Sequence, residues 1–195
     1  MNKNRLEAFS DGVLAILITI MVLELKVPAG TSPGDLCALW PIFLSYILSF
    51  IYIGIYWNNH HHLFQAVRKV SGGVLWANLH LLFWLSLIPF VTAWSGETQF
   101  KELPVASYGV VLMMAAIAYY ILVRVLIAEH GEKSPLALAI GSDEKGRISV
   151  VFYALAIGLA FVHTALACAL YVIVACIWLI PDRRIEKVLS KPDVS

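Results

Sequence analysis

The residues of this sequence that could carry chemistry are polar side chains placed inside long apolar stretches. Besides the run Asn58 to His62, these polar side chains are Ser10, Asp11, Thr19, Glu24, Asn78, His80, Ser86 and Thr92. The sequence contains no G-x-S-x-G, no H-E-x-x-H, no phosphate-binding glycine loop and no pair of E-x-x-H motifs. These motifs are the usual marks of hydrolytic, metal and nucleotide chemistry. We therefore expect no enzyme, no catalytic residue and no cofactor.

Three consecutive histidines, His60, His61 and His62, are the side chains that a metal ion would prefer here. Adjacent residues on a helix point about 100° apart, so the three rings cannot all reach one ion. We expect no metal, and histidines that lie in the membrane interface or form hydrogen bonds between helices. His80 is set deeper in its apolar stretch, where an ionisable side chain usually faces protein and has a partner.

Asp11 is the most informative single residue, because a carboxylate one or two turns inside a membrane helix is costly unless it is paired. Its candidate partners are Arg5, at the same end of the same stretch, and His80 or one of the three histidines. The alternative is that Asp11 lies at the membrane surface in water. The residues alone leave both readings open.

The elements that must position these side chains are membrane helices. The chain has 195 residues, of which 60% are hydrophobic and 14% charged, and its mean hydropathy is +0.80. Stretches such as 105–123 carry no formal charge, so they offer no polar face to water. This composition predicts an all-α, polytopic membrane protein whose solvent is mainly the lipid bilayer.

Polar breaks divide the chain into six expected spans, each close to the twenty residues that cross a bilayer. The third contains Pro89 and should be kinked there. The final apolar block is long for one helix, so we expect a tight hairpin near His163-Thr164. The chain is then a single six-helix unit over 1–195, with spans at about 6–27, 36–64, 74–94, 105–127, 148–162 and 165–180.

Basic residues set the expected orientation of these spans. Six spans place twelve of the 14 Lys and Arg residues on one side and leave Lys26 and Lys101 on the other. Because Lys and Arg accumulate on the cytoplasmic side, both termini should be cytoplasmic. The formal net charge of +1 forms no basic patch, which argues against a nucleic-acid partner.

A helix over the first span places several residues on one stripe. At 100° per residue, this stripe consists of Arg5, Phe9, Gly12, Ile16, Thr19, Ile20 and Leu23, with Ser10 and Asp11 well off it. Such a wall, aliphatic with one hydroxyl layer, has the composition of a hydrophobic constriction that gates by dewetting. Periodicity alone does not distinguish this reading from a face that contacts lipid.

The first span also carries a specific string of residues. The pattern Arg5-x-x-x-Phe9-Ser10-Asp11, followed by 12–16 (Gly-Val-Leu-Ala-Ile) and closing at Val22-Leu23-Glu24, resembles the signature first helix of the transmembrane protein 175 potassium channels. Supporting pieces are Trp57-x-x-His60-His61, the stretch from Asn78 to Pro89-Phe90, and 180–184, which reads Ile-Pro-Asp-Arg-Arg.

The resemblance implies a potassium-selective cation channel without a carbonyl filter, and the first helix would line its pore. The constriction would then map to Ile16, Ile20 and Leu23, with Thr19 as the adjacent hydroxyl layer. A single six-helix unit is similar to the prokaryotic type, which forms a homotetramer in the cell (inner) membrane. The resemblance also implies a structural polar network, which would consist of Arg5, Phe9, Ser10, Asp11 and His80.

A rival reading is a proton-coupled secondary transporter, in which Asp11 and His80 would take up and release the proton. The sequence has no internal repeat and no glycine-interrupted pair of helices of the kind that builds a midplane site. These features argue mildly against the transporter.

Overall fold

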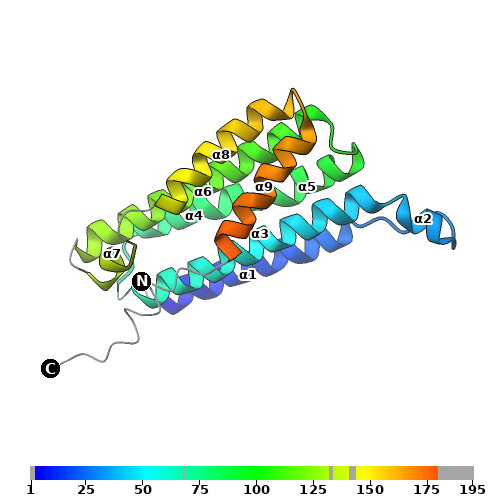
Figure 1. The fold of residues 1–195 in the computed structure, drawn as a ribbon. Helices are drawn as coiled ribbons and strands as arrows, with labels where there is room; N and C mark the ends of the chain where they lie inside the picture. Colours follow the sequence, from blue (N-terminus) through cyan, green and yellow to red (C-terminus); the bar gives the residue numbers. More distant parts are fainter. Residues whose placement is uncertain (1–2, 68, 132–133, 141–143, 180–195) are drawn as a thin grey trace.

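The computed structural model describes residues 3–67, 69–131, 134–140 and 144–179, and the regular elements among them are all helices. They form an elongated bundle in which the start of α1 and α7 lie at one end and α2 at the other (Figure 1). Their bounds are α1 Lys3–Leu23, α2 Pro33–Cys37, α3 Trp40–Gln65, α4 Gly72–Ser86, α5 Ile88–Glu97, α6 Glu102–His130, α7 Pro135–Ile140, α8 Glu144–Ala160 and α9 Thr164–Leu179.

Four segments are long and apolar enough to cross a membrane: Lys3–Leu23, Trp40–Gln65, Gly72–Glu97 and Glu102–His130. The third combines α4 and α5, which are separated at Leu87. Pro89 has no N–H to donate to the carbonyl of Leu85, and its ring crowds that carbonyl, so the helix breaks here. The predicted kink is confirmed.

The first two helices differ from their predicted ranges. Helix α1 ends at Leu23 rather than at residue 27. Pro28 disfavours helical backbone in Val27 and has no N–H to donate to the carbonyl of Glu24, so the helix does not continue through this segment. The expected second helix is divided into α2 and α3. Ser32 caps α2 and forms a capping box with Asp35, and a new helix begins at Trp40 because Pro41 fits its first turn.

The hairpin of α8 and α9 turns at residues 161–163, where the sequence predicts a break. Helix α8 begins at Glu144, four residues before the predicted start of that span. The short helix α7 was not predicted: it lies in the polar stretch between 129 and 147, where Leu136 is fully buried. The C-terminal segment 180–195, which contains four of the counted basic residues, lies outside the described residues.

Helix α6 occupies the middle of the packing, in contact with α4, α5, α8 and α9, while α3 packs on α1, α5 and α9. Small side chains allow these helices to approach closely. A Cβ atom added at Gly109 would overlap the hydroxyl of Tyr171 and lie 2.9 Å from Cγ1 of Ile157. Glycine at this position is therefore required by the contact between α6 and the hairpin.

Buried tyrosines join the hairpin to the rest of the bundle. The hydroxyl of Tyr52 donates to the backbone carbonyl of Tyr171 at 2.6 Å, and the hydroxyl of Tyr171 donates to the carbonyl of Val105 at 3.0 Å. The hydroxyl of Tyr153 lies 3.4 Å from that of Tyr52. Each of these polar groups thus has a partner within the apolar interior, as burial requires.

A second buried hydroxyl cluster connects α3, α5 and α6. The Oγ atom of Ser49 is 2.6 Å from Oγ1 of Thr92 and 2.9 Å from the hydroxyl of Tyr108. Thr92 in turn donates to the carbonyl of Ile88 at 2.6 Å, so the cluster ends on the backbone of α5.

Candidate functional site

Helix α1 has two faces of different character. The face turned to the bundle is formed by the buried residues Leu6, Ser10, Leu14, Leu17 and Met21. The other face is the stripe found in the sequence, and its large side chains are bare: Ile16 is 57% exposed and Leu23 is 82% exposed. An apolar stripe of this kind must be covered by lipid or by another copy of the chain.

The hydroxyl of Thr19 belongs to the exposed face but bonds within its own helix, donating to the carbonyl of Ile16 at 2.8 Å. Threonine commonly satisfies its donor in this way in membrane helices. The donor is therefore used, and the hydroxyl oxygen can still accept through its lone pairs. A layer of such oxygens is able to coordinate a cation that has lost part of its water.

A buried series of hydrogen bonds fixes the N-terminal half of α1 to α3 and α4. Nδ2 of Asn78 donates to Oγ of Ser10 at 2.9 Å, and Oγ of Ser10 donates to the carbonyl of Leu6 at 3.0 Å. Oδ1 of Asn78 is 2.8 Å from Nε2 of His60. Ser10, His60 and Asn78 are each at most 2% exposed.

These hydrogen bonds also place a proton on one nitrogen of the histidine ring. Because the amide nitrogen of Asn78 donates to Ser10, its oxygen faces His60 and can only accept. The Nε2 atom of His60 must therefore carry a proton. His60 thus acts here as a hydrogen-bond donor between helices, and its ring lies tilted against that of Phe64 at a centroid distance of 4.6 Å.

Asp11 lies beside this series of hydrogen bonds and is exposed within the single subunit. Its Oδ1 accepts a hydrogen bond of 3.1 Å from the indole nitrogen of Trp57, whose ring is stacked on that of His61. The partner of Asp11 is thus a tryptophan of α3, not one of the candidates considered from the sequence. An indole donor satisfies the carboxylate without neutralising it.

His80, the other member of the expected network, is bonded elsewhere. Its Nε2 accepts a hydrogen bond of 3.0 Å from the indole of Trp84 on the same helix. Arg5 and Phe9 are exposed, and with Leu75, Asn78 and Leu79 they line a pocket between α1 and α4. Within the described part of the protein, the five predicted network residues are therefore not brought together. Of the five, Ser10 alone belongs to the buried series of hydrogen bonds.

The structure thus adds His60, Asn78 and Trp57 to the site. Each is a polar or amphipathic side chain inside an apolar stretch, and that signal was visible in the sequence. What the sequence could not supply was the pairing, which depends on how α1, α3 and α4 are rotated. The remaining histidines turn apart as helical geometry requires: His61 is bonded to Gln65 at 2.8 Å, while His60 faces Asn78.

The fold and this site define a class first. A described chain that is all helix, with four membrane-length apolar segments and polar side chains buried between them, is a multi-pass membrane protein. Residues 5–89 match the family model of the endosomal/lysosomal potassium channel TMEM175. A potassium channel from Chryseobacterium sp. (strain P1-3) is 61% identical over 98% of this chain and all of its own length. The chain belongs to the TMEM175 family.

Other relatives extend the comparison. A potassium channel from Streptomyces collinus is 34% identical over 90% of this chain and 91% of its own. The crystal structure of a lysosomal potassium-selective channel TMEM175 homolog from Chamaesiphon minutus superposes with a TM-score of 0.80 at 28% identity, covering 92% of this chain and 97% of that one. The family and these relatives are channels, which are not enzymes, in agreement with the sequence prediction.

Proposed function

We propose that this chain is one subunit of a homotetrameric potassium-selective channel that conducts passively through a pore lined by α1. The observation that carries the proposal is the division of α1 into two faces. Its inner face is packed and hydrogen-bonded, and its outer face is an exposed aliphatic stripe. Four such stripes around one axis would cover each other and enclose a path for an ion, and relatives of nearly the same length are named potassium channels.

In this proposal the neck of the pore is formed by Ile16, Ile20 and Leu23, with the oxygens of Thr19 as the adjacent polar layer. Four aliphatic side chains around the axis can make the pore so narrow that water leaves it, which blocks ions. A slight widening of the pore lets water and ions pass again. Selectivity would come from partial dehydration at the neck and from the Thr19 oxygens, because no carbonyl filter loop is present in the sequence.

The proposal includes six spans over 1–195, with both termini in the cytoplasm and the subunit in the cell (inner) membrane. Helices α8 and α9 have 17 and 16 residues, so each is about 25 Å long at 1.5 Å per residue. This is slightly less than the hydrocarbon thickness of about 30 Å, and local thinning of the bilayer would accommodate the difference. The excess of basic residues on one side supports the orientation.

The experiment that tests the proposal is the reversal potential of purified protein in a planar bilayer with potassium on one side and sodium on the other. A current that reverses near the potassium equilibrium potential is expected. The matched comparison is Ile16→Asn against Leu155→Asn, because Leu155 is equally bare at 54% exposed but lies on α8. Only the first should change the reversal potential. Folded protein without any current would contradict the proposal.

Proton permeation is tested in the same bilayer. TMEM175 of Mus musculus, named an endosomal/lysosomal proton channel, is 32% identical over 62% of this chain and 26% of its own length. A pH difference with equal potassium on both sides would drive current only if protons pass. A proton flux strictly coupled to another solute would favour the transporter, although Asp11 and His80 are bonded to separate tryptophans.

A further inference from the structure

The two ends of α1 are attached to the subunit in different ways. The inner, N-terminal half is held by side-chain hydrogen bonds. Lys3 Nζ donates to the carbonyl of Phe64 at 3.0 Å, Ser10 accepts from Asn78 of α4, and Asp11 accepts from Trp57 of α3. From Gly12 to Leu23, no side-chain hydrogen bond to another helix occurs among the described residues. This outer half is held by apolar contacts, which restrict sliding less than directional bonds do.

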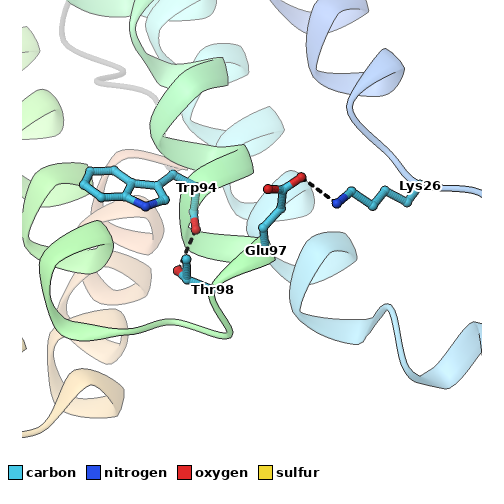
Figure 2. A network of polar contacts seen from close by, with 4 residues as sticks. All are labelled: Lys26, Trp94, Glu97 and Thr98. Carbon is cyan, nitrogen blue, oxygen red and sulfur yellow. Dashed lines mark hydrogen bonds and ion pairs between the residues drawn. The ribbon is translucent and has the colours of Figure 1, made fainter.

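One ion pair lies just beyond the outer end of α1. Nζ of Lys26 is 2.7 Å from Oε1 of Glu97, the last residue of α5. Figure 2 shows the lysine side chain extended from the non-helical segment after α1 toward the end of α5. The end of α5 is itself fixed, because Oγ1 of Thr98 donates to the carbonyl of Trp94 at 2.6 Å.

The direction of this link follows from the packing. Helix α5 contacts α1, and Thr92 and Glu97 of α5 line a pocket together with Met21, which lies on the buried face of α1. This face is opposite the exposed stripe. An attraction between Lys26 and Glu97 therefore draws the outer end of α1 toward the subunit interior. On the stripe, this displacement moves Leu23 and Ile20 away from the neighbouring copies.

We propose that Lys26 and Glu97 form a latch that holds the outer end of the pore helix away from the pore axis and so favours the open neck. The inference rests on the proposed function, and it makes both side chains positioning residues rather than ion ligands. The pair is 56% and 46% exposed, so water competes for it and the latch is readily reversible. An exposed pair of this kind changes an equilibrium by about twofold, or about 16-fold if four subunits move together.

The test is the single-channel open probability of Lys26→Met, Glu97→Gln and the exchanged double variant K26E/E97K. Each single variant should lower the open probability by about 2- to 16-fold, and the exchange should restore it to within about twofold. Matched controls are Lys101→Met and Glu102→Gln, which make the same charge changes at the same end of the bundle. Both control residues are exposed and form no ion pair within the described part of the chain.

Two results would overturn the latch. If Lys26 and Glu97 acted only through the charge of the pore mouth, their two single variants would change the potassium current in opposite directions. If the pair were inert, the single variants would match the controls. A current absent from the unmodified protein would contradict the proposed function instead of the latch alone.

A second measurement decides the latch without any current. The three native cysteines are replaced by serine, and Val27, which is 89% exposed, is replaced by a cysteine that carries a spin label. Lys26→Met should shorten the distance between labels on neighbouring copies, and Lys101→Met should leave it unchanged. An unchanged distance in Lys26→Met would refute the latch.

Discussion

Replacing Asn78 by leucine tests the buried hydrogen bonds that fix the N-terminal half of α1. The two side chains have similar size, so the change removes hydrogen bonds without opening a large cavity. Nε2–H of His60 would lose its acceptor, which costs about 1–3 kcal/mol for a buried donor. The lost bond to Ser10 adds about 0.6 kcal/mol, the average for hydrogen bonds between membrane helices. We expect a loss of about 2–4 kcal/mol in the free energy of unfolding.

The assay is reversible unfolding in mixed detergent and dodecyl sulfate, arranged as a double-mutant cycle with His60→Phe. Phenylalanine preserves the ring contact with Phe64 and removes the donor, so Asn78→Leu should cost only about 0.6 kcal/mol in that background. Ser86→Ala on the same helix is the control, because Ser86 is exposed and should change stability by less than about 0.5 kcal/mol. If Asn78→Leu lowered the free energy of unfolding equally in both backgrounds, the hydrogen bond between His60 and Asn78 would be refuted.

Three further predictions concern the pore, the packing and the outer loop. Ile16→Asn should raise leak current and weaken the preference for potassium; unchanged bilayer currents would remove this residue from the pore. Gly109→Ala should cost about 1–3 kcal/mol by overpacking, whereas Gly158→Ala, with open space around it, should not destabilise; detergent unfolding compares them. Hydrogen bonds from Ser32 lower the pKa of Asp35, so the capping box stabilises α2 above the ordinary pKa of this carboxyl and is lost on acidification; Ser32→Ala should raise that pKa in an NMR titration.

Helix positions were largely predictable because each boundary has a local cause. Pro89 breaks the third segment wherever the rest of the chain lies, and the turn near His163 follows from the length of the apolar block. The early end of α1 was missed because Leu25 and Val27 extend the apolar pattern past Leu23, although the charged residues Glu24 and Lys26 already interrupt it there. The short helix α7 was missed because a single buried leucine in a polar segment gives no periodic signal.

The candidate site was predictable only in part. Helical periodicity placed Ile16 and Leu23 on one face, and the structure leaves that face bare. The partners of Asp11 and His80 depend on the rotation of neighbouring helices, which no single segment encodes. Charge suggested that Asp11 pairs with Arg5 or a histidine, yet indole donors serve both Asp11 and His80, because tryptophan supplies an N–H from an apolar ring without adding a charge.

The buried hydroxyl groups also have a consequence for the movement of protons. A hydroxyl passes a proton onward only when its own hydrogen points to another group that can donate. The cluster of Tyr108, Ser49 and Thr92 ends on the carbonyl of Ile88, and Tyr52 ends on the carbonyl of Tyr171. A carbonyl oxygen has no hydrogen to hand on, so these chains are closed to relay. Any proton current through this protein should therefore respond to changes in the aliphatic neck rather than to replacement of the buried tyrosines.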